Sequence, residues 1–459
     1  MTASTSVQNL QDLRSAFAGP LITEGHEDYD EARRVWNGMI DRRPLLIARC
    51  TGVADVIAAV NFAREQGLTV AVRGGGHNVA GFGTCDDGLV IDLLPMKGIR
   101  VDREARSARA EGGVIWRELD HETQAFGLGT TGGLVSETGI AGLTLGGGIG
   151  WLMRKHSLTC DNLLSADVVT ADGSYLTADQ NQNVDLFWAL RGGGGNFGVA
   201  TSFEYQLHDV GPVVAGGAVF HHLEKAGELL RFYRDWTQTL PDELTTMVVL
   251  VTAPPEPFIP VELQGKHAVA VAGCYAGPVE EGMKAFQSLK DFGPPAADLI
   301  GPMPYAALQQ MFDHSAPRGS YWKTEYIEEL SDEAVSVLVD RAGRLGSPFS
   351  AIHVHHVEGA VNRVEPTATA FIRRDSRYIV NVVGLWMDPA VHDAEVSWVR
   401  DSWRALQPFS GGGPYLNFMD ADEQGRIQAA YGGNYQRLVA AKRQYDPTNL
   451  FRVNQNVRP

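Results

Sequence analysis

The segment 73–81 reads RGGGHNVAG and follows an apolar run, TVAVR at 69–73, that is typical of a strand. Three consecutive glycines at a strand end allow the backbone to approach a ligand closely, and the N–H groups of such a turn can hold an anion such as a pyrophosphate. A tight turn explains any single glycine cluster equally well. His77 lies inside this cluster, and one isolated histidine is more often structural than functional. The segment alone leaves both interpretations open.

The residues before and after this segment predict a strand–helix–strand unit. Residues 45–50 (LLIARC) form a short apolar run, and residues 53–66 have apolar side chains at helical spacing. Gly67 is placed to end that helix. A further strand is expected at 89–93 (LVIDL). The glycine cluster therefore follows the second strand of a βαβ unit.

Three further glycine clusters lie at 146–150, 191–198 and 411–413. The second contains a literal GxGxxG at 193–198, but it follows the helix-like 185–190 and runs into a strand-like segment. A Rossmann turn requires the opposite context, because it follows a strand and opens a helix. The sequence also contains no GxxxxGK[ST], GxSxG or HExxH. A dinucleotide is compatible with these clusters, but not on a Rossmann turn.

The rest of the chain mixes helical and strand patterns. Before residue 210 we expect a helix at 114–126, a hairpin at 166–177 around Asp172-Gly173, and a half-buried strand at 198–207. After residue 210 strands alternate with longer amphipathic helices. The strands are expected at 269–275, 351–357 and 378–386, and the helices at 278–292, 332–345 and 390–407. We predict an α+β protein with a domain boundary near residue 210.

The composition excludes several classes of protein. The 459 residues carry a net charge of −16, so no basic surface is expected for nucleic acid or an anionic membrane. No apolar run approaches a membrane span, and neither a Sec nor a twin-arginine export signal is visible. The four cysteines lack CxxC spacing, which disfavours a disulfide scaffold or a zinc ribbon. We expect a cytoplasmic protein with reduced thiols; its oligomeric state is open.

Three histidines lie together in the expected strand at 351–357. His353 and His355 would share one face of the strand, an arrangement that suits a metal ion, and His356 would face the other side. No third ligand with convincing spacing follows from the sequence, so we expect no metal site. A strand that faces a substrate, or is simply polar, is the favoured interpretation.

Four longer motifs together resemble one family. They are RGGGHNVAG with DGLVIDL (73–81 and 87–93), GIAGLTLGGGIGWLMRKHSLTCDNL (139–163), DLFWALRGGGGNFGV (185–199) and KRQYDPTNLFRVNQNVRP (442–459). In this order and spacing they resemble FAD-linked oxidases of the vanillyl-alcohol-oxidase (PCMH-type) superfamily. The berberine-bridge-enzyme-like branch is the most similar, especially its bacterial members of the 6-hydroxy-D-nicotine oxidase type.

The resemblance implies a two-domain fold. A PCMH-type FAD-binding domain of two α/β subdomains would take residues 1–208, and residues 415–459 would return to it. Residues 209–414 would form a substrate-binding domain with an antiparallel sheet covered by helices.

The resemblance also implies a covalent flavin. His77 would bond to the 8α-methyl group of FAD. Some relatives carry a second bond from a cysteine, but the matching position here is Val135, so we expect a single attachment. The remaining residues expected to bind the cofactor are Arg73, Gly74, Gly75, Gly76, Asn78, Gly81, Gly139, Gly142, Gly146, Gly147, Asn162, Val199, Asn454 and Asn456.

The implied activity is that of an oxidase. Hydride would pass from a CH–OH or CH–NH group of a small organic substrate to FAD and then to O₂, giving H₂O₂. Tyr415 and Asn417, in the stretch YLNF, match a family segment whose tyrosine often assists proton removal; the alternative is that Tyr415 merely packs beside the flavin. His353, His355 and Tyr321, or its neighbour Trp322, are expected to contact substrate. A flavin dehydrogenase with another electron acceptor, or a flavin-containing binding protein without turnover, are the remaining alternatives.

Overall fold

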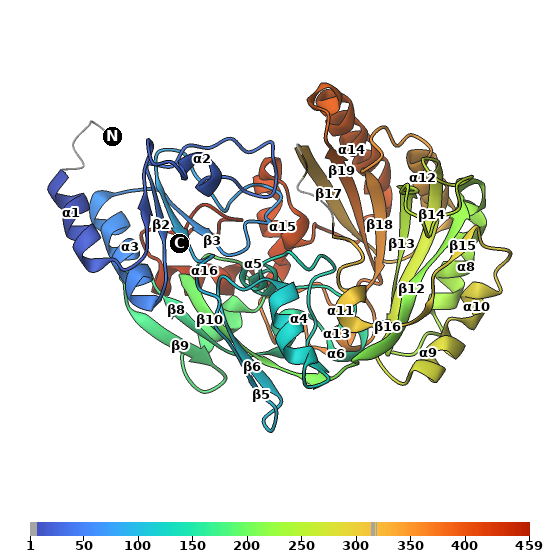
Figure 1. Ribbon diagram of the computed structural model, residues 1–459, viewed down its shortest axis with the longest axis horizontal. Coiled ribbons are helices and arrows are strands. Elements are labelled where there is room, and N and C mark those ends of the chain that lie inside the picture. Colours follow the sequence, from blue (N-terminus) through green and yellow to red (C-terminus); the bar gives the residue numbers. More distant parts are fainter. Residues whose placement is uncertain (1–6, 314–316, 318) are drawn as a thin grey trace.

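The computed structural model describes residues 7–313, 317 and 319–459. Figure 1 shows two lobes, with the first half of the chain in one and a large sheet in the other. Near residue 210 the chain passes from β11 (His208–Asp209) in the first lobe to β12 (Val213–His222) in the second. The proposed domain limits at 208 and 415 stay predictions. In the described part, no helix is long and apolar enough to cross a membrane.

The first sheet of the first lobe carries the glycine cluster. Its order is β1 (Leu21–Ile22), β2 (Leu46–Arg49), β4 (Leu89–Asp92) and β3 (Val70–Arg73), and β4 pairs in parallel with both β2 and β3. The expected βαβ unit forms, with β4 inserted between its two strands. Helix α3 (Val53–Gln66) buries Val56, Ala59 and Val60 against this sheet and ends at Gly67, which has φ 64°. Of two shorter helices, α1 (Val7–Ala16) precedes the sheet and α2 (Tyr29–Ala32) lies between β1 and β2.

The second sheet of the first lobe is antiparallel. Its order is β5 (Ile99–Asp102), β6 (Ser107–Glu111), β10 (Val199–Gln206), β8 (Leu163–Val169) and β9 (Tyr175–Asp179). The expected hairpin at 166–177 corresponds to β8 and β9, which pair antiparallel. Side chains of four helices share one apolar core with this sheet: α4 (Trp116–Gln124), α5 (Ile140–Leu145), α7 (Val184–Leu190) and α16 (Tyr435–Tyr445). Strand β7 (Leu128–Gly129) pairs with β11 beside them.

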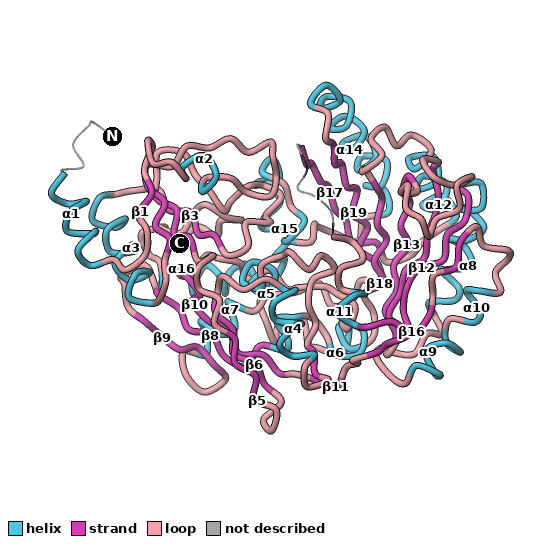
Figure 2. Tube along the Cα trace, viewed as in Figure 1, coloured by secondary structure: helices cyan, strands magenta, loops and turns pink. Residues whose placement is uncertain are grey.

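The second lobe is built on one large antiparallel sheet. Its order is β15 (Ala297–Asp298), β12, β14 (His267–Tyr275), β13 (Leu244–Thr252), β18 (Ala351–His356), β19 (Tyr378–Trp386) and β17 (Gly319–Ile327), and β16 (Gly301–Pro304) also pairs with β12. Helices cover the face that is turned away from the first lobe (Figures 1 and 2). They are α8 (Ala226–Thr237), α9 (Val279–Ala285), α10 (Gln287–Lys290), α12 (Asp332–Ala342) and α14 (His392–Leu406).

The expected helix at 278–292 is the one that differs most. It is divided into α9 and α10 at Phe286, whose fully buried ring packs over Gly273 of the sheet. Strand alternation divides the sheet residues between its two faces. Ile352 and Val354 of β18 belong to the helix-covered core, so His353 and His355 face the other way, toward the first lobe.

The last part of the chain returns to the first lobe. After η5 (Leu416–Phe418), η6 (Ala421–Arg426) and α15 (Ile427–Tyr431), helix α16 leads into the C-terminal tail. Lys442 is fully buried and donates to the carbonyls of Asn196 and Phe451 and to the carboxylate of Asp446. The tail therefore lies against the 191–198 glycine cluster, and Figure 1 shows α16 and the C-terminus together in the first lobe. The other short helices are α6 (Met153–His156), α11 (Tyr305–Leu308) and α13 (Ala360–Arg363).

Candidate active site

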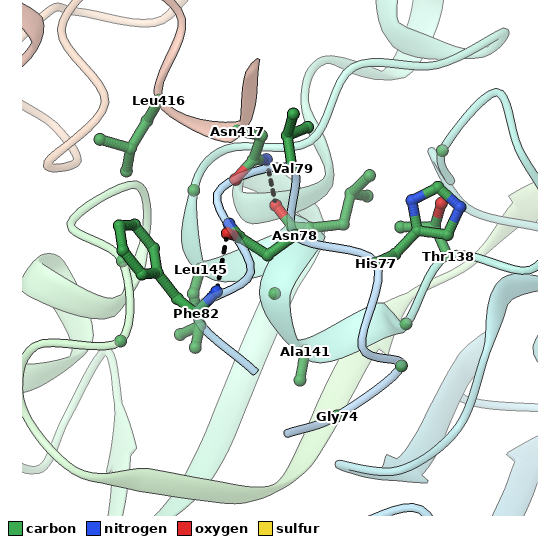
Figure 3. Close-up of a pocket in the computed structure, with 18 of the residues that line it drawn as sticks. Gly74, His77, Asn78, Val79, Phe82, Thr138, Ala141, Leu145, Leu416 and Asn417 are labelled. Atoms are coloured by element: carbon green, nitrogen blue, oxygen red, sulfur yellow. Dashed lines mark hydrogen bonds between the residues drawn. The ribbon is translucent and has the colours of Figure 1, made fainter. Parts of the chain in front are cut away.

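One cavity between the two lobes collects most of the residues selected from the sequence. Its walls come from the turn after β3, the loop and helix around α5, the 194–200 segment, the inner face of the large sheet, and the C-terminal segment. Figure 3 shows the part of the wall with His77, Ala141 and Asn417. The described lining residues include Arg73, Gly74, Gly75, Gly76, His77, Asn78, Val135, Gly139, Gly142, Gly146, His353, His355, Tyr415, Asn417 and Asn454.

The turn after β3 is held by a buried ion pair. Arg73, 2% exposed, donates to both carboxylate oxygens of the fully buried Asp92, at 3.1 and 2.7 Å. Arg73 Nη1 also donates to the Arg34 carbonyl at 3.1 Å. Its guanidinium is thus engaged with protein, so Arg73 supports the turn. Gly75 is needed because any Cβ there would collide with the backbone of Gly139.

His77 is oriented by an aromatic neighbour, Trp36, from the loop between β1 and β2 of the first sheet. The rings of Trp36 and His77 stack, with centroids 4.3 Å apart and planes at 23°. The Trp36 backbone N–H donates to the Gly76 carbonyl at 3.0 Å, and Asn37 Nδ2 donates to the Val79 carbonyl at 2.7 Å. These contacts fix both the imidazole plane and the backbone on either side of it.

Tyr415 lies opposite this turn and accepts two hydrogen bonds at its hydroxyl oxygen. The donors are the Gly148 N–H and Asn417 Nδ2, each at 3.0 Å. Asn417 Nδ2 also donates to the Leu143 carbonyl, and its side chain lies where a Cβ on Gly146 would be. Complete burial raises the pKa of Tyr415 above its ordinary value of 10, although the two donors act in the opposite direction. The phenol is therefore protonated at neutral pH.

The sheet wall of the cavity is polar and, among the described residues, contains no Asp, Glu, Lys or Arg side chain. His353 on β18 pairs across strands with Asn381 on β19. His355 is 2% exposed, and burial, with a smaller effect from His353, lowers its pKa well below 6.5, so its imidazole is neutral. Met247, Phe312 and Trp322 complete this wall.

The structure places six of the selected residues outside the cavity lining. Three of them serve the backbone: Gly81, with φ 70°, packs against Ile40; Gly147, with φ 118°, packs against Phe371; and Asn162 Nδ2 donates to the carbonyls of His156 and Leu158. These three residues shape the turns behind the lining, and their expected part in cofactor binding stays a prediction.

The other three residues lie outside the lining because successive side chains along a strand or an extended segment point in opposite directions. Val199 is fully buried in the core under α3, while its neighbours Gly198 and Ala200 line the cavity. Asn456 is likewise outside the lining, beside Gln455. Tyr321 points to the helix-covered face, where its hydroxyl donates to Asp422 at 2.6 Å. Its neighbour Trp322, the alternative expected from the sequence, lines the cavity instead, and contact of either residue with substrate stays a prediction.

Sequence reasoning missed Trp36 and Asn381. Trp36 carries no motif, and only the fold brings it to His77. Asn381 did leave a signal, because it is the single polar side chain in the apolar stretch YIVNVVGLW at 378–386. A polar residue in the middle of a strand that is otherwise core has to be explained by a partner or a ligand.

Several groups in the cavity are suited to binding FAD. The N–H groups of Gly75 and Gly76 make no hydrogen bond with any described residue, and thus are available to a pyrophosphate. Gly142 and Gly195 each have open space where a side chain would be. Oδ1 of Asn454 is buried without a hydrogen-bond partner among the described residues. Within that same part of the chain, no group of three His, Cys, Asp or Glu side chains could hold a metal ion.

Comparison with known proteins agrees with this fit. The FAD binding domain family matches residues 44–179, and the berberine and berberine-like family matches residues 414–458. The chain is 32% identical to a FAD-linked oxidoreductase of Dictyostelium discoideum, over 99% of this chain and 98% of that protein. It is 30% identical to (R)-6-hydroxynicotine oxidase of Paenarthrobacter nicotinovorans, over 97% and 99%.

Solved structures show the same fold over almost the whole chain. The crystal structure of 6-hydroxy-D-nicotine oxidase from Arthrobacter nicotinovorans has a TM-score of 0.87 at 27% identity, covering 96% of this chain and 98% of that one. A berberine-bridge-enzyme-like protein of Physcomitrella patens also has a TM-score of 0.87, at 23% identity, covering 98% of this chain and 99% of that one. The expected fold and enzyme class are confirmed, and the chain belongs to the berberine-bridge-enzyme-like family of FAD-linked oxidoreductases.

Proposed function

We propose that this enzyme is an oxidase that carries FAD on His77 and acts on a CH–OH or CH–NH group of a small organic substrate. The observation that carries the proposal is the meeting of three features in one cavity. These are the glycine turn with His77, the hydrogen-bonded pair Tyr415 and Asn417, and the polar wall of the large sheet.

Attachment through His77 alone is supported by the surroundings of that residue. Trp36 holds the imidazole plane, so the ring would present a ring nitrogen to the cavity in a fixed direction. Val135 lines the same cavity at the position where some relatives have a second attachment, and its aliphatic side chain cannot form a thioether. The backbone N–H groups of Gly75 and Gly76, with Asn454, would hold the rest of the cofactor.

FAD, when bound, accepts a hydride from carbon and passes the electrons to an acceptor, which in an oxidase is O₂. The protein's part is to position the substrate and manage one proton. After Tyr415 has released its own proton to solvent, its Oη would take the proton from the substrate's O–H or N–H, and the Gly148 N–H and Asn417 Nδ2 would stabilise the negative charge on that oxygen beforehand. Burial opposes the phenolate, so only a small fraction of the enzyme carries this base at neutral pH, and that fraction grows as the pH rises.

The test is reduction of the bound flavin without oxygen, followed by its reoxidation. A panel of aromatic alcohols and amines is mixed with the yellow enzyme under argon, and absorbance near the flavin maximum is followed. The proposal predicts bleaching by some members, and H₂O₂ formed in proportion to product when air is admitted. Bleached enzyme that is reoxidised only by an artificial acceptor would indicate a dehydrogenase. A flavin that no donor bleaches would indicate a binding protein.

A further inference from the structure

Asn381 is a buried polar residue whose side chain makes no hydrogen bond with the described part of the protein. It lies in the middle of β19, is 1% exposed, and lines the cavity. Neither its Nδ2 nor its Oδ1 has a hydrogen-bond partner within residues 7–313, 317 and 319–459. A buried donor and a buried acceptor left unpaired each cost free energy in the folded protein. A residue that weakens the fold in this way is a candidate for ligand binding.

His355 and Trp322 lie near Asn381 and can make hydrogen bonds without carrying charge. His355 is held neutral by burial, and its Nε2 is also without a hydrogen-bond partner among the described residues. Nε1 of Trp322 likewise has no hydrogen-bond partner in that part of the chain. Arg73 is the one Arg, Lys, Asp or Glu side chain among the described lining residues, and it is engaged with Asp92. Apart from the histidines, this wall therefore offers no group that would balance a substrate carboxylate, phosphate or ammonium group.

Aromatic side chains frame this polar patch. Phe418 lies edge-on to Trp322, with centroids 5.4 Å apart, and 5.8 Å from His355. Phe312 lies 6.1 Å from His353. Flat apolar surfaces beside hydrogen-bonding groups are suited to a planar ring that has a polar edge.

We propose that Asn381, assisted by His355, binds the polar edge of an uncharged aromatic substrate that offers a hydrogen-bond donor and an acceptor side by side. A carboxamide or lactam group has this arrangement, and an asparagine amide pairs with such an edge through two hydrogen bonds, as it does with adenine in DNA recognition. The inference rests on the proposed function, because it assigns the substrate class of the same cavity.

Replacement of Asn381 by leucine, which has a similar size, separates a binding role from a structural one. Asn381→Leu removes the unpaired donor and acceptor, so the melting temperature of the holoenzyme is expected to stay the same or rise. Asn434 is the matched control, because it is also buried but donates to the carbonyls of Pro366 and Thr369. Asn434→Leu is expected to lower the melting temperature. An equal loss in both variants would overturn the binding role.

Ligand titration then tests the substrate class. Benzamide, acetophenone and benzoate are titrated into the holoenzyme, and binding is followed by the flavin absorption spectrum and by the rise in melting temperature. We expect benzamide to bind most tightly, and Asn381→Leu to weaken benzamide at least tenfold while changing acetophenone less than twofold. Tightest binding of benzoate, or unchanged benzamide affinity in the variant, would overturn the inference. If the wild-type protein contained no flavin, the proposed function would be contradicted. The melting temperatures of Asn381→Leu and Asn434→Leu would still show whether Asn381 contributes to folding.

Discussion

The surroundings of Tyr415 have opposite effects on the ionisation of its hydroxyl group. Its hydroxyl oxygen accepts from Gly148 N–H and Asn417 Nδ2, an arrangement that favours a phenolate. Its complete burial favours the neutral phenol, and burial is the larger effect on its pKa. A buried tyrosine with two donors and a raised pKa acts as a base only in its deprotonated form, whose population grows as the pH rises.

Tyr415→Phe is expected to lower kcat/KM by about 10²–10⁴, the usual contribution of a positioned acid–base group. In the wild type kcat/KM should rise as the pH increases into the alkaline range, because only deprotonated Tyr415 can accept the proton. The variant should lose this rise while it keeps its flavin absorbance. Tyr326→Phe, a buried tyrosine outside the lining, is the control. A Tyr415→Phe enzyme with wild-type rates would contradict the role.

Asp120 gives a prediction about stability and pH. It is buried on α4 and accepts from Gln309 Nε2 at 3.0 Å, and burial raises its pKa to about 7 from an ordinary 3.8. Between these values the folded protein keeps a proton that the unfolded chain releases, so stability falls as the pH rises toward 7. Asp120→Asn should flatten this dependence of stability on pH. At pH values above 7 it should also raise the denaturant concentration at which half of the protein is unfolded.

The measurement is chemical denaturation of wild type and variant between pH 4 and 8. The amide introduced by Asp120→Asn would keep an acceptor for Gln309, so the packing at this site is conserved. The exposed Asp393→Asn serves as the control. An unchanged slope in the Asp120→Asn protein would show that this carboxyl does not hold its proton in the fold.

At the scale of elements, an ionic network joins the large sheet to the segment that carries the catalytic candidates. Glu325 on β17 is 1% exposed and accepts from Trp403 Nε1 on α14 and from Ser410 Oγ, at 2.7 and 2.5 Å, and from Arg426 on η6. Lys323 on the same strand pairs with Asp422. The network thus fixes β17, α14 and the segment after Phe418 relative to one another.

Glu325→Leu is expected to destabilise the protein by about 1–3 kcal/mol for each donor left unpaired, because Trp403 Nε1 and Ser410 Oγ lose their acceptor, whereas Arg426 keeps Glu423. Thermal unfolding followed by circular dichroism measures the loss. Glu325→Gln, which keeps an acceptor oxygen at this position, should lose less. A Glu325→Leu protein as stable as wild type would show that the network is not needed to hold this segment.

Elements with strong periodicity were predictable, and the site was predictable only where its residues lie in motifs. The α3 helix follows from helical spacing and the β8–β9 hairpin from its Asp172-Gly173 turn. Strands β14, β18 and β19 follow from short runs rich in apolar residues, because almost every residue in them is buried. The insertion of β4 between β2 and β3 depends on pairing between distant segments, which periodicity does not encode. Likewise Trp36 reaches His77 only through the fold, and the alternation of β17 decides between Tyr321 and Trp322.

At the scale of the whole molecule, the cavity exists because separate parts of the chain close around it. Asn37 Nδ2 donates to the Val79 carbonyl in the glycine turn and to the Ser320 carbonyl on β17, which joins the two lobes beside His77. Asp313 accepts from the N–H and the hydroxyl of Ser136, at 2.8 and 2.6 Å, next to Val135 in the lining. The tail from 446 to 459 closes the side formed by the 191–198 cluster. These hydrogen bonds therefore fix the walls of the cavity relative to one another.

The most direct test of the central claim is the visible spectrum of the purified protein, before and after acid denaturation and removal of small molecules. The account predicts a yellow protein whose flavin absorbance stays with the denatured chain. It also predicts that His77→Ala loses this retained colour, whereas Trp36→Ala retains it in part, because stacking orients the imidazole without bonding to the cofactor. Folded wild-type protein without colour, or colour retained in His77→Ala, would contradict the claim that FAD is carried on His77.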